Sequence, residues 1–259
     1  MNPRDAVVGA LAAAAIAALA WRAGALTPGG ALAAFAVGTL TYGSGELGFA
    51  LVLLAFFVPS VLLSRLGRAR KRALVDTGKH GARDALQVLA NGGVAAACAA
   101  GWAFTRDPRW AVAFAGAFAA ATADTWATEI GTVAGRAPRS ILTLRPMPVG
   151  LSGGITLAGT LAEIAGAGWI ALVATIGLPV LAVAPIAIGG TAGATLDSVL
   201  GATLQELRRC DACGRTCETD PHVCGEPTRL VRGLRGFSND LVNLLATAAG
   251  AAVAAALVP

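Results

Sequence analysis

Four carboxylates stand out because each lies at the edge of a long apolar run. Asp124 and Glu129 occur in AATADTWATEIGT, Asp197 in GATLDSVLGATLQ and Asp240 in FSNDLVNLLAT. Carboxylate oxygens suit Mg²⁺, which enzymes usually hold with one or two carboxylates and the phosphates of the substrate. We therefore predict that these four residues form a catalytic Mg²⁺ site, and the chemistry that they favour is phosphoryl transfer.

Further polar and basic residues accompany these acids. Amide and hydroxyl groups recur beside them at helical spacing, and cations flank them where they could pair with phosphate oxygens. Between residues 139 and 156, the stretch RSILTLRPMPVGLSGGIT has the glycines and prolines of an irregular loop, which is either an ordinary turn or an anion-binding loop. The predicted substrate- and nucleotide-binding residues are Lys79, Arg83, Asp84, Gln87, Asn91, Arg139, Arg145, Gly150, Ser152, Gly153, Gly154, Ser198, Gln205, Arg235, Asn239 and Asn243.

The elements that must position these residues are membrane helices. The 259-residue chain is 56% hydrophobic and only 14% charged, with a mean hydropathy of +0.67, whereas a soluble domain has roughly 25% charged residues. The alternating strands of an outer-membrane barrel are missing from the sequence. We predict an all-α polytopic membrane helix bundle that forms one integral membrane domain over residues 1–259, with a cytoplasmic cysteine-rich loop inserted at 206–236.

Charged and Gly/Pro clusters divide the chain into about eight transmembrane segments. Seven are possible because the second is short, and the first could pass for a signal-peptide core, although its flank has no net positive charge. With eight crossings, seventeen of the twenty Lys and Arg residues fall in the odd-numbered loops, which the positive-inside rule places in the cytoplasm with both termini outside. The predicted segments are 6–22, 29–43, 46–64, 84–104, 109–133, 154–176, 179–205 and 237–258.

On these helices the polar residues fall on single faces. At about 100° per residue, Asp84, Gln87 and Asn91 share one face, and Asp197, Ser198 and Gln205 share another. All the clusters lie in the cytoplasmic half of the bundle, and carboxylates within a membrane normally face a bundle interior or a watery cavity. We therefore expect one cytoplasmic pocket, in preference to scattered polar groups that hold helices together.

The inserted loop carries a separate motif, CDACGRTCETDPHVCG. Four thiolates, or three with a histidine, form a tetrahedral zinc site, whereas a cytoplasmic location argues against stable disulfides. Free thiols and a disulfide remain alternatives to a structural zinc ion. The candidate zinc ligands, of which four would be used, are Cys210, Cys213, Cys217, His222 and Cys224.

Five motifs together resemble the DUF92 or TMEM19-type integral membrane family, to which plant phytyl-phosphate kinase belongs. They are RDALQVLANGG, ADTWATEIG, PVGLSGGIT, GATLDSVLGATLQ and NDLVN, and they cover the chain from about residue 80 to the C-terminus. The resemblance implies CTP-dependent phosphorylation of an isoprenyl monophosphate to the diphosphate. It thus implies a transferase, specifically a prenyl-phosphate kinase, whose partners are an isoprenoid lipid and a nucleoside triphosphate.

Three rival functions fit parts of the same pattern. A cytidylyltransferase that forms a CDP-linked lipid would use the same metal and nucleotide site. A cation-coupled secondary transporter would use the carboxylates for coupling, but it would also need polar residues in the outer half of the bundle. A non-catalytic scaffold leaves the carboxylates unexplained. We expect an enzyme in the cell membrane of a prokaryote, with its site facing the cytoplasm and no nucleic-acid partner.

Overall fold

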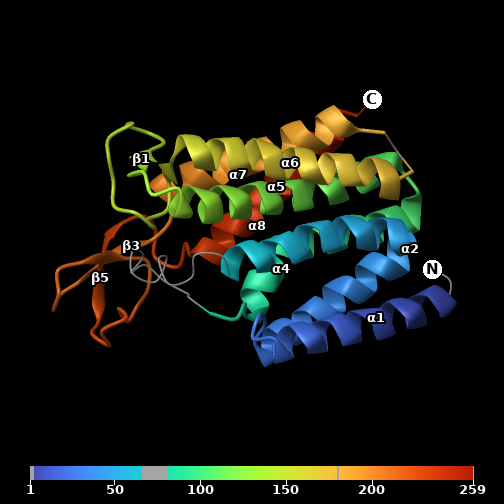
Figure 1. The fold of residues 1–259 in the computed structure, drawn as a ribbon, viewed down its shortest axis with the longest axis horizontal. Helices are drawn as coiled ribbons and strands as arrows, with labels where there is room; N and C mark the ends of the chain where they lie inside the picture. Colours follow the sequence, from blue (N-terminus) through green and yellow to red (C-terminus); the bar gives the residue numbers. More distant parts are fainter. Residues whose placement is uncertain (1–2, 66–80, 180, 259) are drawn as a thin grey trace.

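The protein is a bundle of long helices with small strands gathered at one end (Figure 1). The computed structural model describes residues 3–65, 81–179 and 181–258. Within these ranges, the helices are α1 (Pro3–Arg22), α2 (Pro28–Arg65), α4 (Ala85–Thr105), α5 (Pro108–Val133), α6 (Leu157–Gly177), α7 (Val183–Thr203) and α8 (Asn239–Ala256). The predicted all-α membrane bundle is confirmed.

Helix α2 contains a sharp bend that accounts for two of the predicted segments. At Glu46 the backbone has φ 56° and ψ −146°, in the glycine-rich stretch GSGELG. A straight helix of 38 residues would be about 57 Å long. Instead Arg65, at its end, donates a 3.0 Å hydrogen bond to the carbonyl of Ala23, just before its start. The segments 29–43 and 46–64 are therefore two arms that run in opposite directions (Figure 1).

Five of the described helices, α2, α4, α6, α7 and α8, are long and apolar enough to cross a bilayer, and Ala6–Arg22 is a shorter apolar helix. Helix α5 is not among these five helices, and it lies at the centre of the bundle. Every residue from 111 to 123 is buried, and Phe114 stacks on Phe49 of α2 with ring centroids 4.4 Å apart. Because other helices surround it, α5 does not need a lipid-facing surface.

Small residues let α5, α7 and α8 approach closely. A Cβ atom on Gly193 would lie 2.6 Å from Cβ of Ala120 in α5 and 2.6 Å from the carbonyl oxygen of Ala246 in α8. Close approach through small residues is the usual way in which membrane helices associate. It brings the polar ends of these helices together at the end of the bundle that carries the strands.

Two small antiparallel sheets form that end. Strand β1 (Arg139–Ser140) pairs with β2 (Gly154–Ile155), and β3 (Leu207–Cys210) lies between β4 (Thr216–Cys217) and β5 (Thr228–Arg232). The predicted cysteine-rich loop is thus an ordered three-stranded unit, which we call the cysteine module (residues 206–236). Both termini lie at the opposite end of the bundle (Figure 1).

Candidate functional site

A polar cavity of about 520 Å³ lies at the strand-bearing end of the bundle. Its walls come from the end of α2, from α4, α5, α6, α7 and α8, from the cysteine module and from residues 149–156 before α6, which we call the glycine loop. Most of the predicted site residues converge here, as the sequence pattern suggests. Those that line the cavity are Arg83, Gln87, Asn91, Asp124, Glu129, Gly150, Ser152, Gly153, Gly154, Asp197, Ser198, Asn239, Asp240 and Asn243.

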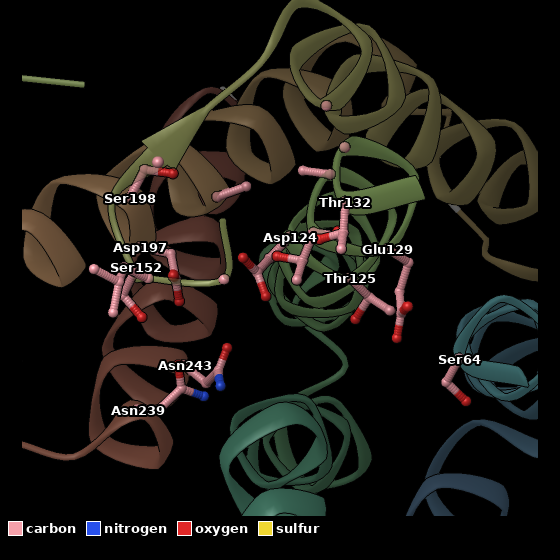
Figure 2. Close-up of a pocket in the computed structure, with 18 of the residues that line it drawn as sticks. Ser64, Asp124, Thr125, Glu129, Thr132, Ser152, Asp197, Ser198, Asn239 and Asn243 are labelled. Carbon is pink, nitrogen blue, oxygen red and sulfur yellow. The ribbon is translucent and has the colours of Figure 1, made fainter. Parts of the chain in front are cut away.

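Asp124 and Asp197 form the acidic centre of this cavity. Figure 2 shows Asp124 of α5, Asp197 of α7 and Asn243 of α8 around one space. Asp197 Oδ2 is buried and has no hydrogen-bond partner among the described residues. Asp197 also lies within electrostatic range of Asp124, Glu163 and Glu218. Repulsion among clustered carboxylates is relieved either by protonation or by a bound cation, and the donor set fits a divalent metal ion.

Glu163 of α6 is one carboxylate that sequence reasoning missed. The residue is only 7% exposed, and its carboxylate accepts a 2.9 Å hydrogen bond from Thr195 Oγ1 of α7. It lines the cavity beside Asp124. In the sequence Glu163 is a single acid within the apolar stretch LAGTLAEIAGAGW, and that isolation inside a membrane helix was the only available signal.

Glu218 is the second missed carboxylate, and it comes from the cysteine module. It accepts hydrogen bonds from the backbone N–H of Ser152 (2.7 Å), the hydroxyl of Ser152 (2.9 Å) and the amide of Gln205 (2.8 Å). Burial raises the pKa of Glu218, and the hydrogen bonds from Ser152 oppose that shift. Gln205 lies outside the cavity lining, and its predicted role becomes one of holding Ser152 and Glu218.

Glu129 lies on a different side of α5 from Asp124. In Figure 2 it lies on the side of Ser64, away from Asp197. Its charge acts on the guanidinium of Arg83 and opposes the effect of burial, which lowers the pKa of Arg83. Backbone hydrogen bonds to Ala25 (2.9 Å) and Thr27 (3.0 Å) hold Arg83 against the α1–α2 connection. Glu129 and Arg83 thus form the rim of the cavity, whereas Asp124 and Asp197 form its centre.

Helix caps position two walls of the cavity. Asp84 accepts a 3.0 Å hydrogen bond from Gln87 N, and Gln87 Oε1 accepts one of 3.2 Å from Asp84 N, which is a capping box at the start of α4. Asp84 therefore starts the helix and lies outside the cavity lining, in contrast to its predicted binding role. Ser238 caps α8 in a similar way, where Asn239, Asp240 and the buried Asn243 enter the cavity.

The glycine loop closes the cavity next to the first turn of α6. Gly153 has φ 83°, and a Cβ atom there would lie 2.5 Å from Cβ of Ala202, so only glycine fits. Thr156 caps α6 and accepts a 3.0 Å hydrogen bond from Gly159 N. Thr156, Gly159 and Thr160 all line the cavity. Backbone amides at a helix N-terminus suit an anion, so this wall could receive phosphate oxygens.

Of the predicted cations that the structure describes, only Arg83 lines the cavity. Arg139 lies outside the lining and donates a 2.8 Å hydrogen bond to the carbonyl of Leu144, because it belongs to the β1–β2 turn. Arg145 and Arg235 are exposed and also lie outside the lining, and Lys79 lies outside the described residues. Arg65 and Arg136 line the cavity in their place.

Next to the polar cavity is a small apolar one of about 80 Å³. Side chains of α1, both arms of α2 and α4 surround it, among them Ile16, Val37 and Phe56. Arg83, Gln87 and Asn91 line both cavities. The two cavities therefore meet at a boundary where one side is charged and the other is hydrocarbon.

The cysteine module brings four of its candidate zinc ligands together. The ligand atoms of Cys210, Cys213, His222 and Cys224 all lie within 4.8 Å of one another. Backbone N–H groups of Cys213 and Ala212 donate to the sulfur of Cys210 and lower the pKa of its thiol. Cys217 is buried outside this group, with its sulfur 3.5 Å from the carbonyl of Thr219.

Residues 11–251 match the family described as integral membrane protein DUF92. Protein PGR of Arabidopsis thaliana is 30% identical over 228 residues, which cover 76% of this chain and 77% of that protein. Uncharacterized membrane proteins of Methanocaldococcus jannaschii and Synechocystis are 32% and 34% identical, over 61% of this chain and 65% and 63% of their own lengths. No solved structure matches the chain at a significant level.

Proposed function

This chain belongs to the DUF92 integral membrane family, and on that premise we propose that it is an Mg²⁺-dependent prenyl-phosphate kinase. It would transfer a phosphoryl group from CTP to an isoprenyl monophosphate and release the isoprenyl diphosphate. The observation that carries the proposal is the junction of an acidic cavity with an apolar one at Arg83, Gln87 and Asn91. CTP and the isoprenyl chain come from the resemblance of the five sequence motifs.

The junction fits a substrate with a charged head and a hydrocarbon tail. Arg83 lines both cavities and would pair with the phosphate of the lipid at their boundary. The first part of the isoprenyl chain would enter the apolar cavity between α1, α2 and α4. The remainder would lie against lipid-facing side chains of these helices, since a cavity of about 80 Å³ holds only a short piece of chain.

The acidic centre fits the metal ion of a phosphotransferase. Asp124 and Asp197 would hold Mg²⁺, with Glu163 and Glu218 beside them. When bound, the ion would neutralise phosphate oxygens and so allow two anionic reactants to approach each other. The glycine loop and the first turn of α6 would orient the triphosphate through backbone amides, and Arg65 and Arg136 would offset its remaining charge.

The reaction needs no protein nucleophile and no general base. An oxygen of the isoprenyl phosphate, already anionic, forms the new bond to the γ-phosphorus of CTP. The bond from that phosphorus to the bridging oxygen breaks, and CDP leaves with the electron pair. The role of the residues around the cavity is therefore positioning and charge stabilisation, which dominate catalysis of phosphoryl transfer.

The test is a product assay on the purified full-length protein. Incubation with Mg²⁺, a panel of nucleoside triphosphates and isoprenyl monophosphates should yield the isoprenyl diphosphate and a nucleoside diphosphate, identified by mass. A CDP-linked lipid with release of pyrophosphate would instead establish the cytidylyltransferase. If no product depends on both Mg²⁺ and protein across the panel, the proposed kinase is wrong.

A further inference from the structure

The cysteine module has almost no core of its own. Among residues 206–236 only Cys210, Cys217, His222 and Thr228 are buried. A unit of this size cannot bury enough apolar surface to order itself, and such units usually contain a metal ion or disulfides. The module nevertheless forms a three-stranded sheet that connects α7 with α8. Something other than hydrophobic burial must therefore stabilise it.

The side chains that meet in the module have the chemistry of a zinc centre. Cys210 Sγ lies 3.6 Å from Cys224 Sγ, and His222 Nδ1 lies 3.6 Å from Cys213 Sγ and 2.9 Å from Cys224 Sγ. A regular tetrahedron with Zn–S bonds of about 2.3 Å has edges of about 3.8 Å. A disulfide would need sulfurs about 2.05 Å apart, and all five cysteines are free. The arrangement therefore fits three thiolates and one imidazole around Zn²⁺.

We propose that Cys210, Cys213, His222 and Cys224 bind one zinc ion, and that this centre holds Glu218 in the polar cavity. Glu218 follows β4 directly and lies between the second and third ligands in the sequence. Binding of zinc by Cys213 and His222 therefore restrains the chain on both sides of Glu218. Cys217, the residue before it, is not a ligand.

Contacts within the module transmit this restraint to the cavity. Arg208 of β3 forms ion pairs with Glu206 (2.7 Å) and Asp220 (2.9 Å), so the segment that carries Glu218 is tied to the central strand. Glu218 in turn accepts the hydrogen bonds from the backbone and hydroxyl of Ser152 in the glycine loop, 66 residues away in sequence. Zinc would thereby fix Glu218 and the glycine loop together.

The zinc site rests on its ligand geometry alone, whereas any effect on turnover rests on the proposed function. The experiment therefore measures metal and backbone protection, neither of which requires a substrate. Full-length wild-type protein, purified under reducing conditions without chelator, should contain about one zinc per chain. Cys213→Ser should lose the zinc, and the matched variant Cys217→Ser should keep it.

Hydrogen exchange in the peptide that contains Ser152 reports the position of Glu218. Removal of zinc from the wild-type protein by a chelator, or Cys213→Ser, should speed this exchange at least tenfold. Glu218→Ala should speed it as well while it keeps the zinc, which shows that the readout responds to this side chain. Cys217→Ser should leave the exchange unchanged.

Three results would overturn the inference. Wild-type protein without zinc would reject the centre, and loss of zinc from Cys217→Ser as well as from Cys213→Ser would reject the ligand assignment. Zinc loss with unchanged exchange at Ser152 would reject the link to Glu218. Because none of these measurements depends on a product, failure of the kinase assay and failure of the zinc proposal are distinguishable.

Discussion

At the scale of single residues, Asp124 distinguishes a metal-binding role from a structural one. Asp124→Asn keeps the shape of the side chain and removes one negative charge from the acidic centre. Metal-dependent nucleotide binding should weaken, and turnover should fall roughly a hundredfold or more, because lost stabilisation of transition-state charge costs several kcal/mol. Turnover with Mg²⁺ and melting temperature are measured on the same preparation.

Asp107→Asn is the matched control on the same helix. Asp107 caps α5 at its other end, where its side chain accepts a 2.9 Å hydrogen bond from Arg109 N. Asparagine is about as good a cap as aspartate, so both turnover and stability should stay near wild type. If Asp124 were only a buried structural acid, Asp124→Asn would leave turnover unchanged and raise stability, because the variant avoids the cost of burying a charge.

The arginines at the cavity give a second residue-scale prediction. Arg83→Gln should raise the KM for the isoprenyl phosphate roughly tenfold or more, since a hydrogen bond to a charged group contributes about 1.5–3 kcal/mol. Arg139→Gln removes the same charge from an exposed residue outside the cavity lining, and its KM should change little. Equal effects of the two substitutions would contradict the placement of the lipid phosphate at Arg83.

At the scale of secondary-structure elements, the site depends on how closely α5, α7 and α8 approach. Gly193 lies one turn before Asp197 and contacts both other helices. Gly193→Ala should destabilise the protein by roughly 1–3 kcal/mol, because the added methyl group overpacks the helix contact. It should also lower turnover, since α7 must move and Asp197 moves with it. Thermal unfolding in detergent measures the first effect.

Gly168→Ala in α6 is the matched control for this prediction. A Cβ atom at Gly168 would meet nothing within 4 Å. Alanine in that helix should therefore be neutral or stabilise the protein by up to about 1 kcal/mol. A similar loss of stability in both variants would show that the Gly193 contact is not what limits the packing of these helices.

At the scale of the whole molecule, the candidate site and the chain termini lie at opposite ends of the bundle. The polar cavity adjoins the cysteine module. The module lies at one end of the bundle, and both termini lie at the other (Figure 1). On the N-terminal side of Asp124, residues 111–123 of α5 are all buried and are mostly alanine. Within residues 111–123, Thr122 is the one polar side chain, and it does not line the cavity.

This arrangement predicts which cysteines are accessible from outside a cell. Cys98 is buried in α4 and the other four cysteines lie in the module, so an impermeant maleimide should not label the wild-type protein in intact cells. Arg106→Cys, in the short connection between α4 and α5 at the other end, should be labelled. Labelling of the wild-type protein from outside would contradict the predicted cytoplasmic orientation of the cavity.

The sequence by itself determined the features that depend on local spacing. Apolar length predicted the membrane helices, and the helical period of about 3.6 residues placed Asp124, Asp197 and Asn243 on polar faces. It also predicted both arms of α2, because a glycine-rich interruption separates two apolar runs. These features can be read from neighbours along the chain, since each depends on backbone geometry that repeats within one helix.

Only the tertiary structure decided which distant groups meet. Glu163 and Glu218 join the acidic centre through helix packing and the path of a loop, neither of which leaves a periodic signal. Four of the five zinc candidates converge, while the sulfur of Cys217 lies 3.5 Å from the carbonyl of Thr219 instead, and the spacing of the cysteines along the chain does not distinguish it from the others. Asp84 shares a helical face with Gln87 yet serves as a cap, because the first turn of a helix leaves N–H groups that need an acceptor.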